Sequence, residues 1–274
     1  MMTTKTIIRP SKGWVLIDFK ELWHYRELLG FLTWRDILVR YKQTFLGVAW
    51  AVIQPVMTMV IFSIIFGRLA KLPSDNVPYP VFSFAALLPW NLFASALNRS
   101  TTSVVGSSSL VTKIYFPRVI IPIASTLSTL VDFLISLAVF VLIMLYYGFK
   151  PGIFFLTVPL LMILTVATAL GVGLWLSALN VKYRDVSQAI PFIVQAWMYV
   201  SPVAYALSLI PSRWSIIYAL NPMVGVIEGF RWALIGRSAW PQGSMMVSLS
   251  VTLLLLVTGA LFFRRMERTF ADIV

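Results

Sequence analysis

Six long apolar segments divide this 274-residue chain, separated by shorter polar or mixed segments. They cover residues 45–66, 79–97, 119–147, 152–179, 190–209 and 245–263. A helix needs about 20 mainly apolar residues to cross the hydrocarbon core of a bilayer. The pattern therefore predicts an all-α integral membrane protein, with a six-helix transmembrane domain over residues 45–274. Residues 1–44 are expected to form a cytoplasmic tail and an interfacial helix.

The segment from Glu21 to Lys42 has an amphipathic helical pattern. Trp23 and Trp34 are placed to lie at headgroup depth, and Asp36 interrupts the apolar face. That face is predicted to contain Leu22, Tyr25, Leu29, Leu32 and Val39. A helix of this kind lies along the membrane surface. We expect it on the cytoplasmic leaflet; a cytoplasmic helix packed only on lipid is the alternative.

Prolines interrupt several of the predicted spans. Pro55, Pro89, Pro191 and Pro202 each remove a backbone donor, so the freed carbonyl must be satisfied by protein or water. Helices broken in this way are expected to face the protein interior or a cavity. The aromatic residues near these breaks are predicted to include residues of a translocation path, and they are Trp50, Trp90, Trp197 and Tyr199. An ordinary interfacial aromatic belt is the alternative.

The segment 210–243 is too polar for a span and too apolar for an ordinary loop. Two short helices that dip into the outer leaflet and return would fit its length, provided that their backbone is buried in protein. An amphipathic extracellular loop is the alternative. Glu228 and Arg231 are three positions apart, and we expect them to pair. The residues assigned to this outer segment are Arg213, Trp214, Asn221, Glu228, Arg231 and Trp232.

The distribution of basic residues predicts how the chain is oriented in the membrane. Most of the 22 Lys and Arg residues fall on the segments that are cytoplasmic if the N-terminus is inside. The outer segments hold the others, which are Arg68, Lys71, Lys150, Arg213, Arg231 and Arg237. Because cytoplasmic loops carry the excess of Lys and Arg, both termini are predicted to be cytoplasmic in a multi-pass membrane protein. The net charge of +12 flanks apolar spans, which favours anionic lipid over nucleic acid as its partner.

Catalytic chemistry is sparse in the sequence. The single histidine, His24, has no carboxylate cluster around it, and the chain has no cysteine. No Gly-Lys dipeptide occurs, so a phosphate-binding loop is excluded. We predict no catalytic residue, no metal site and no cofactor in this chain. Gly171 and Gly173 lie inside an apolar span, where close helix packing explains them.

One carboxylate, Asp132, lies about halfway along the third apolar segment. An intramembrane carboxylate is costly, so Asp132 is expected to face the bundle interior and to have a partner. A structural hydrogen-bonded role is favoured over a role in ion coupling.

Two cytoplasmic segments have the character of docking elements. Ser107 to Ser109 can cap a short helix from Leu110 to Phe116, which Pro117 would end. This helix is too apolar for a freely solvated turn, which suggests contact with another protein. The loop from Asn180 to Gln188 is a second candidate contact, although a basic loop that sets the topology would look the same.

Several motifs resemble one family. The segments that carry the resemblance are LGVAWAVIQP at 46–55, LLPW at 87–90, LVTKIYFPR at 110–118, LNVKYRDV at 179–186, LNP at 220–222 and EGFR at 228–231. Together they look like the membrane subunit of ABC-type polysaccharide exporters, which carry lipid-linked O-antigen, capsule or teichoic acid across the bacterial inner membrane. The resemblance extends, in order, from about Tyr25 to Gly236.

The resemblance implies a homodimeric permease with two separate ATPase subunits below it, which would hold the ATP and Mg²⁺. It implies that the helix at 107–117 is a coupling helix and that the helix up to Lys42 forms part of the ATPase contact. The residues then expected at that contact are Lys113, Tyr115, Phe116, Arg118, Arg35, Arg40, Arg184 and Asp185. The segment from Pro211 to Trp232 would contain the outer gate helices. O-antigen is the expected cargo, and capsular polysaccharide or teichoic acid are alternatives. A secondary transporter and an integral-membrane transferase are the rival classes.

Overall fold

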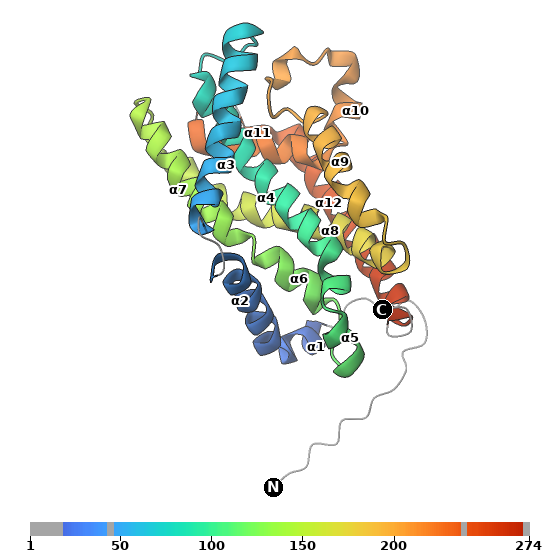
Figure 1. Ribbon diagram of the computed structural model, residues 1–274. Coiled ribbons are helices and arrows are strands. Elements are labelled where there is room, and N and C mark those ends of the chain that lie inside the picture. Colours follow the sequence, from blue (N-terminus) through green and yellow to red (C-terminus); the bar gives the residue numbers. More distant parts are fainter. Residues whose placement is uncertain (1–18, 43–46, 237–239, 271–274) are drawn as a thin grey trace.

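The computed structural model describes residues 19–42, 47–236 and 240–270, which form helices and turns (Figure 1). The tail before residue 19 and the predicted start of the first span at Phe45 lie outside the described residues. The helices are α1 Phe19–His24, α2 Arg26–Lys42, α3 Gly47–Phe62, α4 Tyr79–Gly106, α5 Ser108–Lys113, α6 Ile120–Leu127, α7 Leu130–Tyr146, α8 Val158–Lys182, α9 Val186–Tyr199, α10 Ser215–Ala219, α11 Pro222–Ile235 and α12 Gln242–Glu267. A π-helical turn, η1 Ser63–Leu69, continues α3.

Five helical stretches in the described part of the chain are long and apolar enough to cross a membrane. They are Ala49–Leu69, Tyr79–Gly106, Ile120–Tyr146, Ile153–Lys182 and Gln242–Glu267. The all-helical membrane class is confirmed, and these five correspond to the first four and the last of the predicted spans.

The predicted fifth span, residues 190–209, differs from the structure. Its helix, α9, has 14 residues and ends at Tyr199. Pro202 follows closely; it has no backbone N–H to donate and disfavours a helical conformation at Ser201. The Ser201 hydroxyl donates instead to the Trp197 carbonyl at 2.9 Å. A sixth crossing by one continuous helix is therefore not present here, and the six-span count stays a prediction.

The described ends of the chain meet at one end of the bundle, beside α5 (Figure 1). The Oε2 atom of Glu21 in α1 lies 3.8 Å from the Nη2 atom of Arg264, near the end of α12. Five full crossings alone would leave the two ends on opposite sides. The segment from α9 to α11 therefore returns the chain to the far end before α12 begins.

The bundle is organised around α4, which is mostly buried and packs on α8, while α8 packs on α12. Small residues permit the close approach of α8 and α12. A Cβ at Gly171 would lie 2.9 Å from the backbone nitrogen of Leu256, so only glycine fits there. The sequence interpretation of this glycine as a packing residue is confirmed.

Three of the four prolines singled out by the sequence, Pro55, Pro89 and Pro202, are buried. Pro191, within α9, is exposed. The expectation that the broken helices face protein holds for the first three positions. It fails at Pro191 within this single chain.

The N-terminal helix α2 packs along α6 at the lower end of the bundle (Figure 1). Leu32 is buried there, and Leu22, Tyr25 and Leu29 pack against the same cluster. Val39, which the sequence placed on this face, is exposed instead. Trp23, Phe31 and Trp34 form a second, exposed apolar surface, as a helix lying against lipid requires.

Candidate functional site

Arg231 is the centre of a buried polar cluster in the outer segment. Its Nη1 atom lies 2.8 Å from the Glu228 Oε1 atom, and both side chains are largely buried. Nη2 donates to the Val203 carbonyl at 3.2 Å, and Nη1 also donates to the Tyr205 carbonyl at 3.4 Å. The guanidinium lies 3.7 Å from the ring centroid of Phe82 on α4. The predicted Glu228–Arg231 pair is confirmed, while its role as a gate stays a prediction.

Nothing in the sequence indicated the two carbonyl contacts or the contact with Phe82. They depend on the chain after α9 folding back over α11. The offset of three positions between Glu228 and Arg231 was readable because it lies within one helix.

Asn221 joins the end of α9 to the start of α11. Its Oδ1 atom caps α11 by accepting from the Met223 backbone N–H at 3.0 Å, and it also accepts from the Trp197 indole at 3.0 Å. Its Nδ2 atom donates to the Ser201 hydroxyl at 2.9 Å. Each polar atom of the amide therefore holds a part of the same junction, which explains an asparagine before Pro222.

The rest of the outer segment is held by aromatic side chains. The hydroxyls of Tyr205 and Tyr218 lie 2.8 Å apart. Burial raises the pKa of Tyr218, and its hydrogen bond with Tyr205 raises it further, so the phenol stays neutral. Trp232 contacts the rings of Phe154 and Trp240, with centroids 4.4 and 4.6 Å apart.

Arg213 and Trp214 differ from these residues because both are exposed. The Arg213 guanidinium lies 5.9 Å from the Trp214 ring centroid. The predicted outer set therefore divides into a buried junction and an exposed rim.

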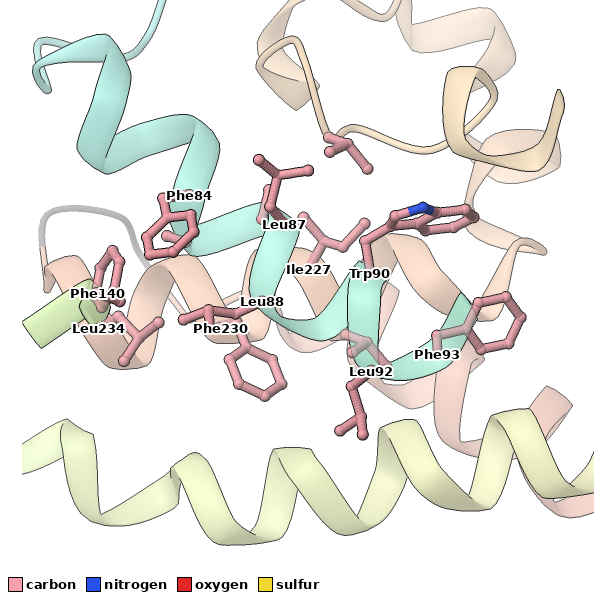
Figure 2. Close-up of a cluster of buried hydrophobic side chains, with 14 of the residues drawn as sticks. Phe84, Leu87, Leu88, Trp90, Leu92, Phe93, Phe140, Ile227, Phe230 and Leu234 are labelled. Carbon is pink, nitrogen blue, oxygen red and sulfur yellow. The ribbon is translucent and has the colours of Figure 1, made fainter. Parts of the chain in front are cut away.

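The predicted path aromatics also divide in two. Trp50 and Tyr199 are exposed on α3 and α9. Trp90 is buried in the core of the bundle and packs against Phe93 (Figure 2), which in turn contacts the ring of Trp197. Residues 81–90 of α4 are all buried in this conformation, so Trp90 is enclosed by the chain here, and its assignment to the path stays a prediction.

The helix after α4, which the sequence predicts on the cytoplasmic side, is shorter than predicted. Helix α5 ends at Lys113, and Ile114 is extended. The predicted cap by the Ser107 side chain is absent. The backbone carbonyl of Ser107 instead accepts hydrogen bonds from the N–H groups of Leu110 and Val111 at the start of the helix. Residues 114–117 then form an irregular strap.

Tyr115 and Phe116 on this strap point to opposite environments. Tyr115 is 66% exposed, whereas Phe116 is 4% exposed and belongs to the same buried cluster as Leu32 and Phe263. The prediction that Phe116 fills a groove of a partner is wrong, since this chain already encloses it. The sequence also missed Ile114, which is exposed beside Tyr115.

Arg118 is engaged inside the chain rather than presented to a partner. Its backbone N–H donates to Glu267 Oε1 at 2.7 Å, and its guanidinium hydrogen-bonds to the Glu267 carbonyl. The strap is therefore tied to the end of α12. Lys113, at the end of α5, is exposed.

The loop between α8 and α9 exposes Tyr183, Arg184 and Asp185. Asn180 fixes it: its Nδ2 atom donates to the Thr101 carbonyl at 3.2 Å, and its Oδ1 atom accepts from the Ser187 N–H at 3.1 Å. A positioned loop with free charged tips suits a second contact surface.

Asp132 has partners from the N-terminal helix, as expected. Arg40 forms an ion pair with its carboxylate, and the Tyr41 hydroxyl hydrogen-bonds to it. Burial lowers the pKa of Arg40, and the positive charge of Arg99 lowers it further. The structural role predicted for Asp132 therefore includes fastening α2 to α7.

Asp36 makes a parallel connection. It accepts from the Ser125 hydroxyl at 3.0 Å and from Arg35 at 2.9 Å. The polar residue that seemed to interrupt the apolar face of α2 therefore contacts α6. Arg35 and Arg40, predicted at a partner contact, are both engaged with carboxylates of this chain.

No group of three or more His, Cys, Asp or Glu residues that could hold a metal ion occurs within residues 19–42, 47–236 and 240–270.

Comparison with known proteins adds to this geometry. The chain is 28% identical over 257 residues to the O-antigen export system permease protein RfbA of Myxococcus xanthus, covering 92% of this chain and 97% of that one. It is 29% identical over 249 residues to the protein of the same name from Klebsiella pneumoniae, covering 90% and 95%. The polysialic acid transport protein KpsM of Escherichia coli is 26% identical over 238 residues, covering 85% and 91%.

The family profile described as "ABC-2 type transporter" matches residues 27–235. That match begins inside α2 and ends at the last residue of α11, so it includes both candidate regions. The chain therefore belongs to the ABC-2 type transporter family of membrane proteins.

Proposed function

We propose that this chain is the permease subunit of an ATP-driven exporter of lipid-linked polysaccharide, with O-antigen as the cargo. The observation that carries the proposal is the alignment along nearly the whole length of both chains with two O-antigen export permeases. The similarity to a polysialic acid transport protein supports the class of cargo and keeps capsular polysaccharide as the alternative.

ATP hydrolysis is assigned to a separate subunit bound at the cytoplasmic end, with its own ATP and Mg²⁺. The surface available for that subunit contains Lys113, Ile114 and Tyr115 on one segment and Tyr183 and Arg184 on the other, all exposed. Exposed aromatic and aliphatic side chains flanked by cations are typical of protein interfaces. These residues replace Phe116 and Arg118 as the proposed contact.

A second copy of the chain is proposed to complete the path. Helix α3 is mostly exposed, and α9 presents Phe192, Ile193 and Tyr199 outward. Two copies facing each other through these helices would enclose Trp50 and Tyr199 between them. Aromatic faces contact sugar rings through apolar surface without gripping them, which suits a polymer that slides. In this arrangement the protein is a multi-pass component of the bacterial inner membrane with both termini cytoplasmic.

The Arg231 cluster is proposed to keep the outer exit closed between transport cycles. Glu228→Gln keeps the shape of the side chain and removes the charge that faces Arg231 at 2.8 Å. The gate role predicts impaired export or leakage of small solutes through resting vesicles. Normal export together with a tight membrane would reject it. Lys150→Gln, which removes an exposed charge on the loop after α7, is the control.

Reconstitution tests the function directly. Proteoliposomes containing this chain and its ATPase subunit should accumulate lipid-linked O-antigen in the opposite leaflet when ATP is added. They should not do so with ATP and a catalytically dead ATPase. Transport driven by a proton or sodium gradient without ATP would instead favour a secondary transporter.

A further inference from the structure

A groove of about 660 Å³ lies between η1 of the first span, the start of α4 and the end of α7. Met59, Val60, Ile64, Leu142 and Ile143 make much of its wall, so the wall is largely apolar. Ligand pockets in proteins commonly measure about 300–1,000 Å³. The groove is therefore large enough to hold a small molecule or part of a lipid.

The groove is at the outer ends of three spans. Its lining includes Arg68 near the end of the first, Tyr79 at the start of the second, and Tyr146 and Tyr147 at the end of the third. Tyr146 is 86% exposed, and tyrosines at this depth are typical of the membrane interface. The opening is therefore toward the outer leaflet, with its apolar wall at acyl-chain depth.

Arg68 gives the groove a charge. Its side chain is exposed at the rim, and the structure records no ion pair for it within the described residues. A guanidinium is well suited to bind a phosphate through two parallel hydrogen bonds. The groove thus combines an apolar wall with one phosphate-binding cation at headgroup depth.

The wall is held in shape by the π-helical turn. A Cβ on Gly67 would lie 2.8 Å from the Tyr79 ring, so η1 fits against α4 only with glycine there. The Ser63 hydroxyl donates to the Met59 carbonyl at 2.7 Å and so has a partner without a ligand. π-Helical turns are rare and are often found at functional sites.

We propose that this groove binds an anionic glycerophospholipid of the outer leaflet, with an acyl chain along the α3–α7 wall and the phosphate at Arg68. A lipid phosphate at this position would neutralise the charge of Arg68. The proposal goes beyond the export function and does not depend on the identity of the cargo.

The groove also connects to the outer cluster. The Tyr79 hydroxyl hydrogen-bonds to the Ala204 carbonyl. The neighbouring carbonyls of Val203 and Tyr205 are those that hold Arg231. A lipid in contact with Tyr79 therefore touches a side chain that holds residues 203–205, and these residues in turn hold Arg231.

The test measures contact between the groove and brominated lipids. Because the native chain has no cysteine, Leu142→Cys at the exposed rim can carry a single fluorophore in the full-length protein in nanodiscs. Brominated phosphatidylglycerol should quench it at a several-fold lower mole fraction than brominated phosphatidylcholine does. About fivefold is the ratio that corresponds to about 1 kcal/mol for a partly exposed ion pair. A label at Leu249→Cys, on the exposed face of α12, should report a ratio near one.

Arg68→Gln should bring the Leu142 ratio close to one. Lys71→Gln is the matched control, because Lys71 is an exposed cation on the loop between η1 and α4 that does not line the groove. This variant should keep the preference. Equal quenching by both lipids in the parent protein would overturn the proposal, as would equal losses in the two variants. Absence of quenching by either lipid would also overturn it, because the groove would then hold no lipid. Displacement by a polyprenyl phosphate in preference to phosphatidylglycerol would assign the groove to the lipid anchor of the cargo, against the proposal.

Discussion

The buried junction around Arg231 and the strap at residues 114–117 differ in what their side chains contact. Around Arg231, the charged and polar groups contact other groups of this chain: a carboxylate, two carbonyls and an aromatic face. On the strap, Ile114 and Tyr115 are exposed, while Phe116 anchors the segment in the core. The exposed apolar side chains of the strap suit contact with a partner, whereas the Arg231 cluster already has its partners within this chain.

The largest expected effect of a single substitution is at Arg231. Arg231→Met leaves the buried Glu228 carboxylate without its partner, which should lower the free energy of unfolding by about 3–5 kcal/mol. Equilibrium unfolding of the purified protein in detergent measures this effect. Adding Glu228→Gln should recover part of the loss. A single variant as stable as the parent would show that the junction is not a stabilising unit.

Phe116→Ala should be the next most damaging change. It removes a ring buried with Leu32 and Phe263 and leaves a cavity, at a cost of about 3 kcal/mol. The same unfolding measurement applies. The neighbouring Tyr115→Ala should change stability by less than about 0.5 kcal/mol, because its ring is exposed. Equal destabilisation by the two variants would remove the distinction between anchor and contact residue.

Asp132→Asn should have an intermediate effect. The amide can still hydrogen-bond to Tyr41 but no longer pairs with the charge of Arg40. Both ionic groups are partly exposed, so we expect a loss of about 1 kcal/mol in unfolding free energy. Protease cleavage of α2 should also become faster, because its fastening to α7 is weakened. Unchanged cleavage would indicate that Asp36 and Ser125 suffice to hold the helix.

The smallest effect is expected at the exposed rim of the outer segment. Arg213→Gln removes only the contact with the exposed Trp214 ring, worth about 0.5 kcal/mol. Stability should therefore remain within error of the parent protein. A loss as large as that of Arg231→Met would contradict the division of the outer segment into a buried junction and an exposed rim.

The sequence predicted the fold class and five of the spans because apolar length is a local property. It also predicted the Glu228–Arg231 pair, which depends on spacing along one helix. The predicted fifth span runs past Tyr199 because apolar residues continue there. Hydropathy alone does not indicate that the helix ends before Pro202.

The burial of Phe116 and Trp90 was missed for a different reason. An aromatic residue in a short apolar segment has the same composition whether it meets its own core or a partner. Phe116 is enclosed together with Phe263, far along the chain, and Trp90 with Trp197 through Phe93. Such distant contacts leave no periodic signal in one sequence. Conversely, Asp36 disturbed the amphipathic pattern because its partner, Ser125, is on another helix.

The affinity between this purified chain and a separate purified ATPase subunit tests whether the strap is the docking surface. Tyr115→Ala should weaken binding of the ATPase by about 30-fold, which corresponds to about 2 kcal/mol for an interface anchor, while the unfolding free energy is unchanged. Lys150→Gln, an exposed charge on the loop after α7 and outside both proposed contact segments, serves as a surface control. If Tyr115→Ala binds the ATPase as tightly as the parent protein does, with the fold intact, the strap is not the docking surface.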